Sequence, residues 1–194
     1  IEAFDLCFGN APFDDLVKKK IGLDFDENGQ IAAKGEVNFK LTQEILANNI
    51  FSQKPPKSFH RQDFKEILAK LDDLEISDAL ATLAHIHAEI LKINLKFLSN
   101  KPEKIFIAGG GRKNPAIIKE LKKSLKEEKI AINLIDEIGL NGDAIEAEAF
   151  GFLAIRSLKN LPISFKKTTG INLTKDQSNS DCCLNGGVLY KNRA

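Results

Sequence analysis

Methionine is absent from the 194-residue sequence, and the chain begins with Ile1. Because this is unlike a normal translation start, we expect the sequence to be the remainder of a longer protein or to have lost an upstream part. The three cysteines, Cys7, Cys182 and Cys183, are too few for a disulfide framework, and adjacent cysteines pair poorly. We therefore expect a protein of the reducing cytoplasm.

Long uncharged runs and an excess of one charge are lacking as well. The most apolar long segment, residues 80–98, is interrupted by charged side chains and histidines, which argues against a membrane span. Glu2 and Asp5 stand where a signal peptide would carry basic residues. A net charge of +1 gives no long-range attraction to nucleic acid or to anionic lipid. We expect neither kind of partner.

The most informative stretch that is present runs from Lys104 to Pro115. A short apolar run ends in Gly109, Gly110 and Gly111, and Pro115 opens a segment with helical periodicity, which predicts strand, tight turn and helix. Three glycines remove every Cβ from the turn, so a ligand can lie directly on backbone N–H groups. A nucleotide-like ligand is one interpretation. A plain turn is the other, because the spacing matches neither of the common nucleotide-binding glycine motifs.

A second candidate lies near the N-terminus. Residues 2–8 form a short apolar run that contains Asp5 and ends at Gly9 and Asn10, which predicts a strand, a turn and then a helix capped by Asn10. A carboxylate inside an apolar strand must be hydrogen-bonded, metal-bound or catalytic, because burying it alone costs several kcal/mol. An Asx-type turn is the alternative interpretation.

A long helix is predicted from Ser77, as its cap, to about Ser99. Its apolar positions form two adjoining stripes, so we expect a central and largely buried helix. His85 and His87 are two residues apart and point away from each other on a helix. Because Glu89 lies one turn after His85, we expect a surface pair and no metal site.

The second half of the chain indicates the fold class. Residues 115–126 are predicted to form a helix and residues 130–135 a strand, so helix, strand and helix follow one another as in α/β proteins. Asp143 and Glu146 have the spacing of a capping box, in which Asp143 caps the next helix and Glu146 reaches back to its start. A final strand is expected at residues 188–190.

Taken together, these segments resemble the C-terminal half of the anhydro-N-acetylmuramic acid kinase family. The similarity runs in order from Phe4 to about Gly187. The matching residues are Phe4-Asp5, Gly9-Asn10, Pro55 to Ser58, Arg61, Phe64, Gly109 to Gly111, Asn114-Pro115, Gly139, Asp143, Glu146-Ala147, Ala149-Phe150, Leu153-Ala154, Arg156, Leu161-Pro162 and Thr169-Gly170.

The resemblance implies an α/β fold, a ribonuclease-H-like lobe of the superfamily of sugar kinases, actin and heat-shock ATPases. Residues 1–194 would form a single C-terminal lobe, with the N-terminal lobe absent. The family closes two lobes on ATP and Mg²⁺, opens the anhydro ring of a cell-wall muramic acid sugar with water and phosphorylates O6. The implied partners are ATP, the anhydro amino sugar, the N-terminal lobe and a second copy in a homodimer.

The same resemblance assigns roles to individual residues. Asp5 matches the general base, which takes a proton from the attacking water. Glu146 matches a sugar-binding carboxylate, and no residue matches a metal ligand. The residues that match the nucleotide-binding turns are Gly9, Asn10, Gly109, Gly110, Gly111 and Asn114.

The sequence also departs from the family pattern. Leu6-Cys7-Phe8 replaces Thr-Gly-Pro, which removes a hydroxyl donor and places a side chain where the backbone meets phosphate. If that position needs a positive φ, Cys7 is strained by about 1–2 kcal/mol. Because the phosphate-binding loop of the family lies in the other lobe, we expect little or no catalysis by this chain alone. A non-catalytic remnant and another sugar kinase of the superfamily are the alternatives.

Overall fold

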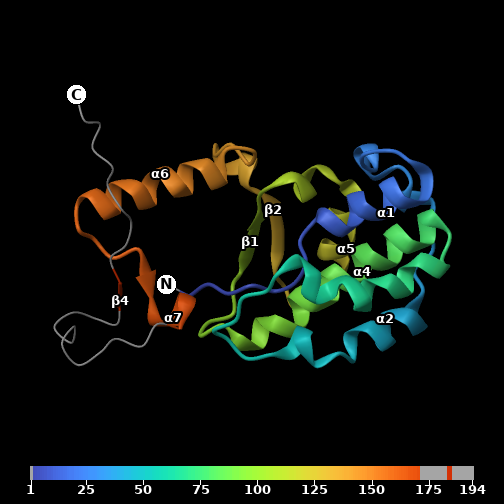
Figure 1. Ribbon diagram of the computed structural model, residues 1–194, viewed down its shortest axis with the longest axis horizontal. Coiled ribbons are helices and arrows are strands. Elements are labelled where there is room, and N and C mark those ends of the chain that lie inside the picture. Colours follow the sequence, from blue (N-terminus) through green and yellow to red (C-terminus); the bar gives the residue numbers. More distant parts are fainter. Residues whose placement is uncertain (1, 171–182, 185–194) are drawn as a thin grey trace. The chain divides into compact units, whose positions relative to one another are not determined.

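The computed structural model describes residues 2–170 and 183–184. Its helices are α1 (Ala11–Ile21), α2 (Phe39–Leu46), α3 (Lys65–Leu68), α4 (Ile76–Asn94), α5 (Pro115–Ser124), α6 (Ile145–Leu158) and α7 (Lys166–Thr169) (Figure 1). Its strands are β1 (Lys104–Ile107), β2 (Ala131–Leu134), β3 (Ser164–Phe165) and β4 (Cys183–Leu184). None of the helices described is both long and apolar enough to cross a lipid bilayer.

The chain divides into two compact units. The large unit comprises residues 6–53 and 59–143, and the small unit comprises the described residues of 1–5, 54–58 and 144–194. The division falls between Asp5 and Leu6, inside the segment that was expected to be a strand. Residues 2–8 form no strand, so that expectation is wrong. The segment belongs to two units, so no single neighbouring strand can pair along its whole length.

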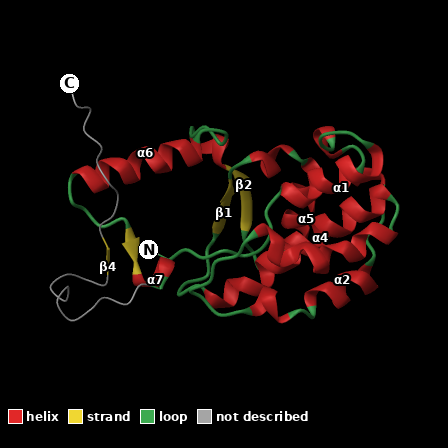
Figure 2. Ribbon diagram, viewed as in Figure 1, coloured by secondary structure: helices red, strands yellow, loops and turns green. Residues whose placement is uncertain are grey.

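Helix α4 is the centre of the large unit. Leu80, Leu83, Ile86 and Ile90 have no exposed surface, and α1, α2 and α5 pack against the helix (Figure 2). The periodicity therefore predicted the central helix correctly. The expected cap is wrong, since the helix begins at Ile76 after Glu75, which places Ser77 inside the first turn.

The large unit also contains a parallel pair of strands. Lys104 lies opposite Ala131 and Ile107 opposite Leu134, and α5 connects β1 to β2. Because α5 packs on both β2 and α4, it covers the pair on the side of the helical core. The fold is therefore a mixed α/β structure with helices and a small parallel sheet, in agreement with the predicted strand, turn and helix.

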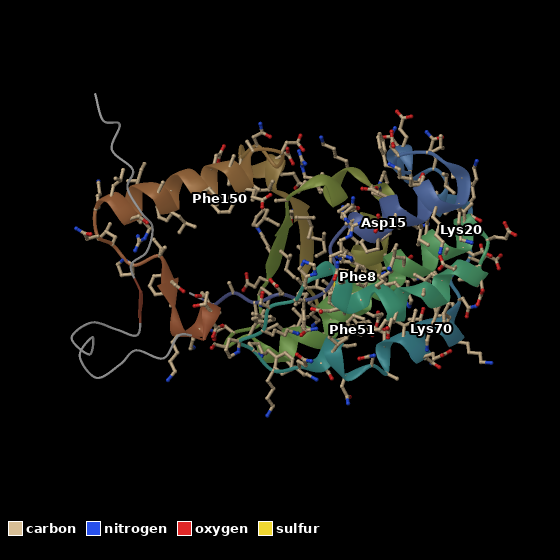
Figure 3. The ribbon with its side chains drawn as sticks, in the orientation of Figure 1. Phe8, Asp15, Lys20, Phe51, Lys70 and Phe150 are labelled. Carbon is tan, nitrogen blue, oxygen red and sulfur yellow. The ribbon has the colours of Figure 1, made fainter. Side chains whose placement is uncertain are left out.

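The family-divergent residues before Gly9 fit into this core. Phe8 is buried, with its ring centroid 5.5 Å from that of Phe64 and 6.5 Å from that of Phe51 (Figure 3). Cys7 is half-buried and is not among the residues with a positive φ. The strain considered for Cys7 therefore does not arise in this conformation.

The small unit brings together segments that are far apart in the sequence. The backbone N–H of Ala3 donates to the carbonyl of Lys167, and that of Asp5 donates to the carbonyl of Lys57. A Cβ on Gly170 would collide with the ring of Pro56. β3 and β4 pair antiparallel. The strand expected at residues 188–190 lies outside the described residues.

Helix α6, in the small unit, carries apolar side chains around most of its circumference. None of its residues is buried, and Phe150, Phe152, Ile155 and Leu158 are each more than half exposed. Figure 3 shows Phe150 on this helix. Helices with so little polar surface are normally covered by other protein. The exposed apolar surface of α6 is therefore a distinctive feature of the small unit.

Candidate functional site

Two glycine turns adjoin in the large unit. Gly9 has φ of +62° and Gly109 has φ of +76°, in the region that favours glycine. A Cβ on Gly111 would lie 3.6 Å from both Cβ and Oδ1 of Asn10. The turn that precedes α1 and the turn that follows β1 therefore lie side by side, although they are far apart in the sequence.

The backbone of these turns is accessible. A Cβ placed on Gly9, Gly109 or Gly110 would meet no heavy atom within 4 Å apart from those of the adjacent residues in the chain. A ligand can approach the main chain closely at these three positions, as the run of glycines predicted for two of them. Gly111 differs, because Asn10 occupies the space beside it.

Asn114 is oriented by the helix that it begins. Its Oδ1 accepts a hydrogen bond from the backbone N–H of Ala116 at 3.0 Å, so it caps α5. A Cβ on Gly29 would collide with this oxygen. Since Oδ1 faces the protein, Nδ2 is the polar atom through which Asn114 can contact a ligand.

We expect Asn114→Ala to lower the free energy of unfolding by about 1 kcal/mol, because the first turn of α5 loses its side-chain cap. Asn114→Asp is the matched control, since it keeps an oxygen at the capping position and loses only Nδ2. Urea unfolding followed by circular dichroism measures both. Equal destabilisation by the two substitutions would contradict the capping role.

Asn10 also precedes a helix but does not cap it through its side chain. α1 begins at Ala11, with Pro12 in its first turn, and no side-chain bond from Asn10 caps the backbone N–H groups. Instead, Nδ2 of Asn10 donates to Asp14 at 3.4 Å. Asn10 does occupy the predicted position before the helix. The predicted capping bond is wrong, because Asn10 has helical φ and ψ and its side chain turns towards Asp14.

Arg112 lies behind the glycine turn and is a residue of this site that no sequence motif indicates. Its side chain is 6% exposed and forms a bidentate pair with Asp136, through Nε at 2.7 Å and Nη2 at 3.2 Å. Nη1 donates to Asp143 at 2.8 Å and to the carbonyl of Gly109 at 3.1 Å. No spacing in the sequence pairs Arg112 with Asp136 or Asp143, so only the fold reveals these contacts.

The ionic contacts of Arg112 shift the pKa values of three side chains, those of Arg112, Asp136 and Asp143. Hydrogen bonds that Arg112 donates to Asp143 and Asp136 raise the pKa of Arg112. The guanidinium lowers the pKa of Asp136, and together with Lys113 it lowers the pKa of Asp143. Arg112, Asp136 and Asp143 are therefore charged at neutral pH.

The predicted capping box is wrong. Helix α6 begins at Ile145 after Ala144, and no side chain caps it. Asp143 instead accepts from Arg112 and forms an ion pair with Lys113 at 2.8 Å, because bonds to cations are stronger than a bond to a neutral amide. Glu146 is exposed in the first turn of α6.

Asp5 belongs to the small unit. The side chain is exposed, and its Oδ2 accepts a hydrogen bond from the hydroxyl of Ser58 at 3.1 Å. Of the interpretations offered for this carboxylate, burial in an apolar strand is wrong. The hydrogen bond joins two segments that match the family pattern, Phe4-Asp5 and Pro55 to Ser58.

The histidines have partners that the sequence did not indicate. His85 contacts Glu120 of α5 at 3.1 Å, whereas Glu89 accepts from Ser124 at 2.5 Å. The expected pair of His85 and Glu89 is therefore wrong, because α5 packs against this face of α4. Among the residues that the structure describes, no three His, Cys, Asp or Glu side chains cluster as a metal site would require.

His87 points into the aromatic core. Its ring centroid lies 5.8 Å from that of Phe8 and 6.4 Å from that of Phe13. Its Nδ1 is buried and has no hydrogen-bond partner in the described part of the chain. Burial lowers the pKa of His87 to about 4. The ring is therefore neutral at physiological pH.

Comparison with known proteins identifies one family. A family model described as anhydro-N-acetylmuramic acid kinase matches residues 1–177. A protein of that name from Zymomonas mobilis subsp. mobilis is 46% identical over 169 residues, which cover 87% of this chain and 45% of the relative. A relative of the same name from Roseobacter denitrificans is 36% identical, with 87% and 44% covered, and one from Ruegeria sp. is 35% identical, with 96% and 47% covered. The chain spans about half the length of the curated relatives that it matches.

Proposed function

Because the chain belongs to the anhydro-N-acetylmuramic acid kinase family, we propose that residues 1–194 form the C-terminal lobe of an ATP-dependent sugar kinase of the cytoplasm. The substrate is 1,6-anhydro-N-acetylmuramic acid. Water adds to its anomeric carbon, the anhydro ring opens, and O6 receives the γ-phosphate of ATP. The product is N-acetylmuramic acid 6-phosphate, an intermediate of peptidoglycan recycling.

The lobe is proposed to have the ribonuclease-H-like fold of the superfamily of sugar kinases, actin and heat-shock ATPases. The parallel pair of β1 and β2, connected by α5, supports this assignment. A homodimer, which the family resemblance implies, is part of the proposal. Sedimentation of the purified protein tests it.

The observation that carries the proposal is the contact between the two glycine turns. The accessible backbone at Gly9, Gly109 and Gly110 fits a nucleotide, because a flat base and ribose can lie against main chain that lacks side chains. Asn10 borders the space through its contact with Gly111, and Asn114 offers Nδ2. We assign these residues to the adenosine part of ATP.

Magnesium is proposed to bind with ATP. Mg²⁺ in such enzymes keeps several waters, binds phosphate oxygens and takes one or two carboxylates from the protein. When bound, the ion neutralises phosphate charge, and no residue of this chain is assigned to it.

Asp5 is proposed as the general base. Ser58 donates to one oxygen of the carboxylate, which orients the group, and an exposed carboxylate is an acid–base group suited to take a proton from water. Glu146, in the same unit, is proposed to bind the sugar. Its exposure on the first turn of α6 leaves the carboxylate available for a hydroxyl group of the substrate.

The chain alone is expected to show little or no turnover. Its curated relatives have about twice its length, and the resemblance assigns the phosphate-binding loop to the part that is not matched here. The alternative function is a non-catalytic remnant, which the side chains of Leu6, Cys7 and Phe8 favour, since they replace the family's Thr-Gly-Pro. A third alternative is that the chain belongs to another sugar kinase of the superfamily, with the same fold and a different sugar substrate.

A chimera tests the proposal. This chain replaces the matching part of the Zymomonas mobilis kinase, and the product formed from Mg-ATP and the anhydro sugar is measured by mass spectrometry. We expect the 6-phosphate from the chimera and none above background from the chain alone, with the intact relative as positive control. A folded chimera without product supports the remnant, and product only from other sugars of a panel supports the third alternative.

A further inference from the structure

We propose that Arg112 is a positioning residue, which holds the main chain of Gly109 to Asn114 in the conformation that receives the nucleotide. The role in nucleotide binding rests on the proposed function. The restraint of the turn stands on contacts within the large unit, so it can be measured without a ligand.

Gly109 is held from both sides. Its N–H donates to the carbonyl of Gly142 at 3.1 Å, and its own carbonyl accepts from Nη1 of Arg112 at 3.1 Å. Its φ of +76° and ψ of −179° form a combination that is essentially restricted to glycine. The contact with Arg112 therefore stabilises the residue at which the chain leaves β1 in an unusual conformation.

Arg112 also fixes the neighbouring loop, residues 136–143. Asp136 receives two hydrogen bonds from the guanidinium, and its Oδ1 accepts a further, longer one from the backbone N–H of Gly142 at 3.4 Å. A Cβ on Gly142 would collide with Nε of Arg112, so a larger residue there would displace the guanidinium from this position. Gly109, Arg112, Asp136 and Gly142 thus form a closed ring of hydrogen bonds.

Burial distinguishes this role from direct binding. With 6% of its side chain exposed, Arg112 lies behind the turn and has almost no surface to offer a ligand. Lys113 is the next residue, pairs with the same Asp143, and is 62% exposed. Exposed pairs contribute little, whereas a buried guanidinium that donates to two carboxylates and a carbonyl restrains all three. Lys113 is therefore a matched control.

Hydrogen exchange of the full chain, followed by mass spectrometry, tests the restraint in Arg112→Gln and Lys113→Gln. In Arg112→Gln we expect the amides of residues 110–114 to exchange on the order of tenfold faster, while those of α4 keep their rates. Calorimetry with ATP is expected to show affinity about tenfold weaker. Lys113→Gln is expected to change neither quantity.

The outcomes separate the two hypotheses. Unchanged exchange at residues 110–114 in Arg112→Gln overturns the positioning role. Absence of ATP binding by the unsubstituted chain counts against the proposed nucleotide site, while the exchange comparison still decides the restraint. If Arg112→Gln loses protection throughout, Asp136→Asn, which keeps the size of the side chain, replaces it. If Arg112→Gln and Asp136→Asn both lose as much protection from hydrogen exchange in α4 as in the turn, Arg112 stabilises the whole unit and not the turn in particular. That result also overturns the proposal.

Discussion

In the chimera with the Zymomonas mobilis kinase, Asp5→Asn is expected to lower kcat by about 100- to 10,000-fold, the usual contribution of a general base. The amide has nearly the same shape as the carboxylate, and it can still accept from Ser58 through its oxygen. It cannot take a proton from the attacking water. Steady-state rates of 6-phosphate formation measure the loss, and KM is expected to change little.

Glu2→Gln is the control for this substitution. Glu2 is a carboxylate of the same unit, three residues before Asp5, and its Oε1 pairs with Lys167 at 2.9 Å. Its neutralisation is expected to leave kcat within about twofold of the unsubstituted chimera, since a partly exposed ion pair contributes little. A chimera whose Asp5→Asn and Glu2→Gln forms turn over equally fast would show that Asp5 is not the base.

Acid is expected to destabilise the large unit through His87. The unfolded chain protonates this ring below a pKa of about 6.5, whereas the folded chain does so only near pH 4, because burial disfavours the charged form. Between these values the unfolded state binds more protons. Stability that is present above pH 6.5 is therefore lost as the pH falls, by up to about 3 kcal/mol at and below pH 4.

His87→Phe isolates this contribution. Phenylalanine keeps an aromatic ring beside Phe8 and Phe13 and stays neutral at every pH. The free energy of unfolding of the His87→Phe protein is therefore expected to fall less steeply as the pH is lowered. Urea unfolding of both proteins across the same pH range gives the difference. That difference is expected to be constant above pH 6.5 and to grow between pH 6.5 and pH 4. Parallel curves over the whole range would exclude His87 as the titrating group.

Local patterns in the sequence predicted much of the fold. β1, the turn that follows it and the start of α5 were identified from the apolar run, the three glycines and Asn114-Pro115. Each of these elements is determined by residues that are adjacent in the sequence. The spacing of apolar residues likewise identified α4. The incorrect predictions involve residues whose partners are far away in the sequence. Glu120 reaches His85 from another helix, Arg112 takes Asp143 away from the helix cap, and residues 2–8 are shared between two units.

The candidate site was less predictable than the fold. Gly9, Gly109 and Asn114 could be selected from turn chemistry and from family resemblance, and their roles towards ligands stay predictions. The contact between Asn10 and Gly111 depends on how α1 and β1 pack in the large unit, so no spacing in the sequence reveals it. Arg112 was missed because a lone arginine after glycines is usually solvated. Only the fold brings Asp136 and Asp143 to it.

The composition of the small unit has a consequence for the order of folding. Asp5 is synthesised before the whole of the large unit, whereas Lys167 and Gly170, which belong to the same unit as Asp5, are synthesised after it. Joining segments so distant requires closure of long loops, and the entropy of closure is lost before the contacts compensate for it. The large unit can bury its own core first. The surroundings of the proposed base are therefore completed late, after the whole of the large unit has been synthesised.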